Sequence, residues 1–209
     1  MTAVIDYDAG NIKSVENALI SLGEKTVTTR DHDVILHADR VILPGVGSFG
    51  DAMDRIRSYG LEDVIIEVVK RGIPFLGICL GLQLLFEESD ESPGVKGLCI
   101  LPGKILRIPD APGLKIPHIG WNSLTFPNEG RLFKGIAQQE AAKAISPYVY
   151  FVHSYYLEAS EESIVTAATE YGGTYIHASV ERDNVFACQF HPEKSSETGL
   201  QILRNFLEV

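Results

Sequence analysis

The sequence predicts an α/β fold in three layers, with a mainly parallel sheet covered by helices on both faces and an added section of antiparallel strands. In the first half of the chain, short apolar runs of strand length alternate with amphipathic helical stretches. That pattern places parallel strands side by side and helices on their faces. Near the C-terminus the apolar runs are instead separated by the turn pairs 172–173 and 183–184, which are typical of joined antiparallel strands.

The parallel section follows from apolar spacing. A short buried strand is expected at residues 3–6, followed by a helix with apolar residues at intervals of three or four before Gly23. Leu61 begins a second helical stripe, which ends at Gly72 and Pro74. Further strands of this section are predicted over residues 26–29, 40–43 and 75–78.

Three strand-like runs predict the antiparallel section. They cover residues 164–171, 175–181 and 185–190. A closing helix follows, in which Ser196 is a candidate cap and Glu197 suits the positive first turn. Because the chain shows no internal repeat, low-complexity tract or linker, we expect a single domain over residues 1–209.

Charge and cysteine usage exclude several classes of function. The formal net charge is −10 and no Lys/Arg cluster is present, so nucleic acid is not an expected partner. The three cysteines lie far apart and lack metal-binding spacing, so we expect no disulfide and no metal site. The N-terminus leads directly into a strand and no apolar run approaches membrane-spanning length. We therefore expect a cytoplasmic protein without a membrane partner.

Cys79 is the strongest candidate for a reactive residue. It follows the predicted strand 75–78 and is flanked two positions away by Gly77 and Gly81. A sharp strand-to-helix turn needs such glycines because neighbouring backbone comes close, and the turn exposes the side chain. The amides of the helix that follows would favour a thiolate. The alternative is a buried structural cysteine. Cys99 and Cys188 lack the pair of flanking glycines and are expected to be structural.

His191 and Glu193 can supply the partners of a cysteine nucleophile. Residues two apart on an extended chain project from the same face, and Pro192 disfavours a helix at His191. Glu193 would orient the imidazole, while His191 would exchange protons with Cys79 and with a departing amine. Without Cys79, a surface turn would be the better interpretation of this motif. Together the residues indicate hydrolysis of an amide through a thioester.

Attack on an amide carbon creates an oxyanion, which needs backbone amide donors. One donor is expected from Leu80, the residue after the nucleophile. The glycine-rich segment 44–50 is the candidate for the second, because its glycines would let the amides of Val46 and Gly47 approach a substrate closely. A plain turn without a ligand is an equally good interpretation of that segment.

These motifs resemble those of the class I glutamine amidotransferases, whose glutaminase domains carry a Gly-x-Cys-x-Gly-x-Gln turn and a late His-x-Glu. The matching residues here are Gly77, Cys79, Gly81, Gln83, His191 and Glu193. The resemblance implies the three-layer, flavodoxin-like fold of that family. It also implies hydrolysis of glutamine to glutamate and ammonia without a cofactor.

Longer segments are similar to family members that pass ammonia to a separate (β/α)8-barrel cyclase subunit, as a heterodimer, in histidine biosynthesis. These segments are residues 6–11, 44–49, 117–122, 150–155 and 191–195. The residues that the resemblance places beside bound glutamine are Gln83, His153, Ser154 and Tyr155. Those around the oxyanion are Val46, Gly47 and Leu80. Those near the partner are Asn11, Trp121, Asn122 and Lys194.

Two positions bear on how such a site would work. Asp8 stands where the family pattern leads us to expect glycine, which concerns the backbone dihedrals of its loop. Val46 is a residue other than glycine in the oxyanion segment. We therefore expect that its amide needs a rearrangement before it points inward, which would give low activity without the partner.

Three other functions stay open. The chain could serve a different synthase, such as one for pyridoxal phosphate or anthranilate, which the copurifying acceptor subunit would reveal. It could be a non-catalytic regulatory subunit of the same fold, although all three members of the Cys-His-Glu set are present. It could also be a free-standing cysteine hydrolase for another amide, which a substrate screen without a partner would detect.

Overall fold

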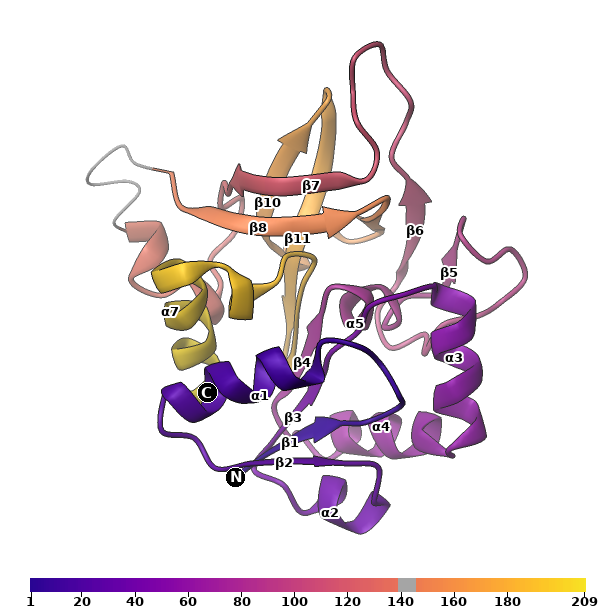
Figure 1. Ribbon diagram of the computed structural model, residues 1–209, viewed down its shortest axis with the longest axis vertical. Coiled ribbons are helices and arrows are strands. Elements are labelled where there is room, and N and C mark those ends of the chain that lie inside the picture. The colour runs from indigo at the N-terminus through magenta and orange to yellow at the C-terminus, as the bar shows by residue number, and fades with distance from the viewer. Residues whose placement is uncertain (139–145) are drawn as a thin grey trace.

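The computed structural model describes residues 1–138 and 146–209, which form a ten-stranded sheet, a separate two-stranded sheet and the surrounding helices (Figure 1). The parallel half of the large sheet has the strand order β2, β1, β3, β4, β12. Its members are β2 (Thr26–Thr29), β1 (Thr2–Ile5), β3 (Arg40–Leu43), β4 (Phe75–Ile78) and β12 (Val185–Cys188). Three of the predicted strands have the expected bounds, and β1 lies one residue earlier than expected.

Helices cover both faces of this parallel half. They are α1 (Ile12–Ser21), α2 (His32–Leu36), α3 (Phe49–Ser58), α4 (Leu61–Lys70), α5 (Leu80–Gln83) and α7 (Ser196–Leu207). Successive side chains of a strand point to opposite faces. Val4 accordingly packs in the hydrophobic cluster of α1 and α7, whereas Ile5 packs in the cluster of α2, α3 and α4. The predicted three-layer α/β architecture is confirmed.

The antiparallel section continues the same sheet. β12 pairs with β11 (Thr174–Arg182), which pairs with β10 (Val165–Tyr171) and β9 (Tyr155–Ala159). Beyond β9 lie β6 (Gly103–Arg107) and β5 (Glu88–Ser89). The prediction of three antiparallel strands needs one correction, because β12 is antiparallel to β11 but parallel to β4. It therefore joins the two halves of the sheet, and it ends at Cys188 so that residues 189–191 leave the strand.

A two-stranded hairpin forms the second sheet and was not foreseen from the sequence. It pairs β7 (His118–Ser123) with β8 (Tyr148–His153) in antiparallel register, and Figure 1 shows it above α7 and α1. Three short 3-10 helices complete the described elements: η1 (Arg131–Phe133), η2 (Glu162–Ile164) and η3 (Pro192–Lys194). Among the described residues, no helix is both long and apolar enough to cross a membrane.

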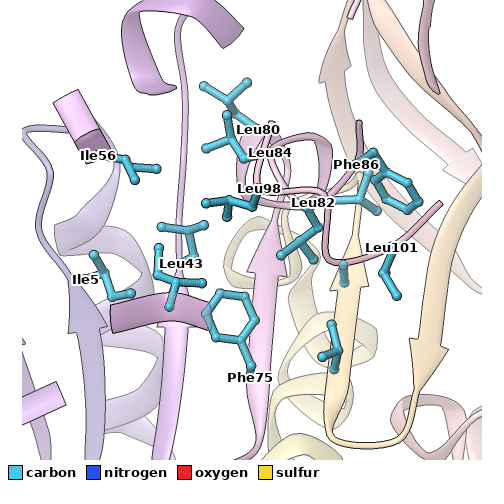
Figure 2. Close-up of a cluster of buried hydrophobic side chains, with 14 of the residues drawn as sticks. Ile5, Leu43, Ile56, Phe75, Leu80, Leu82, Leu84, Phe86, Leu98 and Leu101 are labelled. Atoms are coloured by element: carbon cyan, nitrogen blue, oxygen red, sulfur yellow. The ribbon is translucent and has the colours of Figure 1, made fainter. Parts of the chain in front are cut away.

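The turn after β4 is anchored by the buried leucines that follow Cys79. Leu80, Leu82 and Leu84 are buried in the same cluster as Leu43 and Phe75 of the parallel strands (Figure 2). Each fully buried leucine contributes about 1.5–3 kcal/mol relative to an exposed one. The apolar run that follows Cys79 therefore fixes the position of that residue at the carboxyl end of the sheet.

Candidate active site

Cys79 occupies a strained backbone position at the end of β4. Its dihedral angles are φ 55 and ψ −108, outside the regions that L-residues ordinarily adopt. Such strain costs on the order of 1–3 kcal/mol. The two flanking glycines are sterically required. A Cβ added to Gly77 would lie 2.6 Å from the carbonyl oxygen of Gly81, and a Cβ added to Gly81 would lie 1.9 Å from the carbonyl oxygen of Leu43. The turn has the geometry that presents a nucleophile.

The helix after Cys79 is too short to supply the positive potential that the sequence analysis expected from it. α5 spans only Leu80–Gln83, which is one turn. Because the macrodipole builds up over several aligned peptides, so short a helix offers little positive potential to a thiolate. The positive charge beside the sulfur must therefore come from a side chain.

That side chain is His191, which is 1% exposed. Its Nδ1 lies 2.7 Å from Oε1 of Glu193. Burial lowers the pKa of His191, but the nearby Cys79 sulfur and the hydrogen-bonded Glu193 carboxylate outweigh this effect and raise it to about 9. The ring is therefore an imidazolium at neutral pH, and a cation in that position stabilises negative charge on the sulfur.

The two ring nitrogens of His191 have different surroundings. Nδ1 is held by Glu193, whereas Nε2 has no hydrogen bond of normal geometry to any described residue. Proton exchange with Cys79 therefore falls to Nε2. The Cys79 sulfur contributes to the raised pKa of the ring, but no hydrogen bond joins the two side chains among the described residues, so their pairing in catalysis stays a prediction.

The His191 turn is fixed by backbone contacts with β8. The His191 amide donates to the Tyr150 carbonyl oxygen at 2.9 Å. Ser195 Oγ donates to the His191 carbonyl oxygen at 2.6 Å and accepts from the Tyr150 amide at 2.9 Å. Ser195, rather than Ser196, precedes α7, and it makes no capping hydrogen bond because its hydroxyl serves the turn.

Asn11 adds a contact that sequence reasoning missed. It sits at the start of α1 in a left-handed conformation and makes no capping hydrogen bond. Instead, its Nδ2 donates to Oε1 of Glu193 and lies 3.4 Å from Nδ1 of His191. Asn11 thus helps to orient the carboxylate and the imidazole. No sequence signal could have joined two loops 182 residues apart.

A cavity of about 300 Å³ opens beside Cys79. Eight of the residues expected around it from the sequence line it: Val46, Gly47, Cys79, Leu80, Gln83, His153, Ser154 and Tyr155. Glu91, Pro117 and Val152 also line the cavity and were not expected. The volume is at the lower end of the range for small-molecule sites, which suits a ligand of amino-acid size.

Glu91 is the acidic residue of this cavity wall. Its Oε2 accepts the backbone amide of Phe49 at 2.7 Å, which fixes the carboxylate against the start of α3. A fixed carboxylate in a partly enclosed cavity is suited to bind an ammonium group. Its sequence context, an acidic stretch after the nucleophile, did not distinguish it from a solvated surface.

The oxyanion site is not open in this structure. The Leu80 amide, which we expected to be a donor, already donates to the Gly45 carbonyl oxygen at 3.3 Å. Rotation of the peptide between Gly45 and Val46 would move the Gly45 carbonyl away from the Leu80 amide. The Val46 N–H, on the opposite side of the same peptide, would then point toward the oxyanion position. Gly47 follows with φ +103, a conformation that glycine adopts readily.

Trp121 and Asn122 lie on opposite faces of β7. Trp121 is 51% exposed, and the hairpin register places it beside four further side chains. We call this set the hairpin face: Ile119, Trp121, Tyr148, Tyr150 and Val152. Asn122 points to the other side and donates to the Glu170 carbonyl oxygen at 2.9 Å. Of the two, only Trp121 is presented for contact with a partner; Lys194 is exposed on η3.

Asp8 adopts the conformation for which glycine was expected. Its φ is 61, a left-handed value that aspartate tolerates better than most residues. The side chain is held by Arg30 at 2.6 Å and by the Tyr59 hydroxyl. The departure from the family pattern therefore leaves the loop dihedrals intact.

Comparisons with known proteins identify the family to which the chain is related. The family model "Glutamine amidotransferase class-I" matches residues 3–209. The protein named imidazole glycerol phosphate synthase subunit HisH from Methanothermobacter thermautotrophicus is 48% identical over 209 residues, covering 100% of this chain and 98% of that protein. The protein of the same name from Moorella thermoacetica is 50% identical over 207 residues, covering 99% and 94%.

Solved structures show the same fold at lower identity. A crystal structure of a glutamine amidotransferase has a TM-score of 0.73 and 22% identity, covering 99% of this chain and 97% of the other. The glutaminase domain of Trypanosoma brucei CTPS with bound acivicin has a TM-score of 0.65 and 16% identity, covering 99% and 93%.

Proposed function

The chain belongs to the class I glutamine amidotransferases, and from this premise we propose that it is the glutaminase subunit of an imidazole glycerol phosphate synthase in histidine biosynthesis. The observation that carries the activity is the cavity in which Cys79 and Gln83 lie together with the fixed carboxylate of Glu91. The acceptor is inferred from relatives of that name at 48–50% identity over nearly the whole chain. We assign residues 1–209 to one glutaminase domain.

The proposed reaction proceeds in two steps. The Cys79 thiolate attacks the carboxamide carbon of glutamine, and the His191 imidazolium gives its proton to the departing nitrogen, so that ammonia leaves and a thioester forms. His191, now neutral, takes a proton from water, whose oxygen attacks the thioester and releases glutamate and the thiolate. Glu193 and Asn11 orient the ring throughout.

Substrate recognition is assigned to the cavity walls. The carboxylate of Glu91 would pair with the α-ammonium group of glutamine. The segment of His153, Ser154 and Tyr155 also lines the cavity. Leu80 and Val46 would supply the oxyanion donors, with Gly47 allowing the backbone to move.

The hydrogen bond between the Leu80 amide and the Gly45 carbonyl supports regulation by a partner. While the Gly45 carbonyl occupies the Leu80 amide, the oxyanion has no donor there, and loss of one such donor costs roughly 10²–10³-fold in turnover. A partner that favours the rotated peptide would raise activity by shifting this equilibrium.

The partner is assigned as a (β/α)8-barrel cyclase subunit that receives the ammonia. The exposed hairpin face next to the cavity supports a protein interface, because aromatic side chains such as Trp121 are enriched in interface cores. Lys194 lies on η3 beside His191 and would add a charged contact. We place the complex in the cytoplasm, in keeping with free thiols at the three cysteines.

A glutaminase assay with and without the cyclase and its nucleotide substrate tests this function. We expect slow release of glutamate from the isolated chain and at least about 100-fold faster release from the complex, as the oxyanion donor becomes available. Equal rates for the isolated chain and the complex would contradict the regulation by peptide rotation. Activation by a different synthase subunit, but not by the cyclase, would instead reassign the pathway.

Trp121→Ala is expected to weaken binding of the cyclase by at least about tenfold, because truncation of a hot-spot tryptophan in an interface typically costs about 2 kcal/mol or more and tenfold corresponds to about 1.4 kcal/mol. The measurement is the dissociation constant of the complex by calorimetry. Tyr175→Ala is the matched control, since Tyr175 is an aromatic residue of similar exposure, 53% against 51%, on β11. Equal effects of the two substitutions would argue against the hairpin face as the interface.

A further inference from the structure

A chain of hydrogen bonds leads from the Cys79 sulfur to the segment 153–155, which also lines the cavity. Gln189 Nε2 donates to Sγ of Cys79 at 3.7 Å, and Gln83 Nε2 donates to Gln189 Oε1 at 3.0 Å. Gln83 Nε2 also donates to the Tyr155 carbonyl oxygen at 3.0 Å. The same carbonyl oxygen lies 2.9 Å from Nδ1 of His153. The nucleophile and the segment 153–155 therefore share one polar network.

The network continues into β7 through a residue that does not line the cavity. His153 Nε2 lies 3.2 Å from Nδ1 of His118. Nε2 of His118 lies 3.5 Å from Nδ2 of Asn122, which also donates to the Glu170 carbonyl oxygen at 2.9 Å. His118 thus connects the cavity wall to β10.

The partners of these two histidines fix their tautomers. A carbonyl oxygen can only accept, so Nδ1 of His153 is the donor to Tyr155 and its Nε2 is the acceptor. Nδ1 of His118 must then carry the proton donated to His153, and Nε2 of His118 accepts from Asn122. The arrangement requires both rings to be neutral. Burial lowers the pKa of His118 to about 4 and that of His153 to about 3, so both are neutral at pH 7.

Aromatic packing fixes the orientation of His118. The ring stacks on Tyr171 at a centroid distance of 3.9 Å and on Phe151 at 4.8 Å, each at an interplanar angle of 18°. His118 is only 3% exposed. A side chain held by two stacking partners and two hydrogen bonds has one available position, which makes it a rigid support for His153.

We propose that His118 is a positioning residue for glutamine: its Nδ1 proton holds His153, and thereby the substrate-facing segment 153–155, in register with Cys79. This inference rests on the proposed glutaminase function. His118 acts through His153 and touches neither the substrate nor the reacting atoms. Its loss is expected to affect binding of glutamine in the ground state and the transition state equally, which raises KM and leaves kcat nearly unchanged.

Three substitutions test this assignment in the complex with the cyclase. His118→Phe keeps an aromatic ring between Tyr171 and Phe151 but removes the proton donor to His153. His118→Asn places an amide N–H near the position of Nδ1. His177→Phe is the control: His177 is a half-buried histidine of β11 that accepts the Ala159 amide at 3.1 Å and lies outside the cavity.

We expect His118→Phe to raise the KM for glutamine about tenfold, with kcat within about twofold of wild type. This is the pattern for loss of an interaction that stabilises the bound substrate and the transition state equally. His118→Asn should recover most of that loss, and His177→Phe should leave both constants unchanged. A wild-type KM in His118→Phe, an equal rise in His177→Phe, or failure of His118→Asn to recover binding would each overturn the assignment.

A folding defect is separated from a positioning defect by thermal melting of each variant. Should His118→Phe fail to fold, His118→Gln decides the question, because its amide reaches the position of Nε2 but not that of Nδ1. A wild-type KM in folded His118→Gln would overturn the proposal, and a raised KM would support it. A wild-type complex that does not hydrolyse glutamine would contradict the proposed function itself, which distinguishes that failure from this one.

Discussion

Cys79→Ala is expected to reduce glutamine hydrolysis by at least about 10³-fold, because removal of a nucleophile eliminates the covalent pathway. The thioester cannot form without the sulfur, and His191 has no acid to exchange protons with. The fold should persist, since alanine retains the Cβ and the strained dihedrals of the turn are supported by Gly77 and Gly81. The measurement is the initial rate of glutamate release from the complex with the cyclase.

Cys79→Ser is a second test of nucleophilic attack by residue 79. A serine hydroxyl is a far weaker nucleophile than a thiolate unless a base removes its proton. The Cys79 sulfur is also one of the groups that raise the pKa of His191, so the serine variant loses the pairing of thiolate and imidazolium as well. We therefore expect little recovery of activity over Cys79→Ala, because the hydroxyl is a poor nucleophile at neutral pH. Cys99→Ser is the control, since Cys99 is exposed and should not affect the rate. Near-normal turnover in either Cys79 variant would remove Cys79 from the mechanism.

The local part of this site was predictable because its signals are local in sequence. The spacing of Gly77, Cys79 and Gly81 reports a steric requirement of a single turn, and the structure shows the contacts that impose it. His191 and Glu193 do meet as predicted, but the expected reason was wrong: residues 192–194 form the 3-10 helix η3 instead of an extended stretch, and the contact is made across its first turn. The parallel strands were predicted because both faces are buried, which leaves continuous apolar runs such as β4.

The remaining features depend on contacts between segments far apart in the chain. Asn11 reaches Glu193 across 182 residues, and Glu91 faces the cavity only because α3 and the loop after β5 pack together. The hairpin of β7 and β8 brings together strands separated by a long connection. The orientation of the Gly45 carbonyl toward Leu80 is a choice between two peptide rotations. A sequence of permissive glycines allows both rotations and selects neither.

Gly81→Ala is expected to destabilise the protein by about 3 kcal/mol or more, at the upper end of overpacking effects. The added Cβ would lie 1.9 Å from the Leu43 carbonyl oxygen, which belongs to the backbone of β3 and cannot move as a flexible side chain would. Either β3 or the Cys79 turn must shift, so activity should fall together with stability. Urea unfolding measures the effect as a lower midpoint at constant slope.

The sign of this prediction opposes the intrinsic preference of the two residues. Gly81 lies within α5 and has no positive φ, so alanine would favour its backbone conformation by about 1 kcal/mol in the absence of neighbours. Gly94→Ala is the matched control, because Gly94 has φ +85 and no atom within 4 Å of an added Cβ. There the cost is only that of the dihedral, about 1–2 kcal/mol. An equal or larger loss at Gly94 would show that backbone conformation, rather than the close approach to β3, keeps glycine in the nucleophile turn.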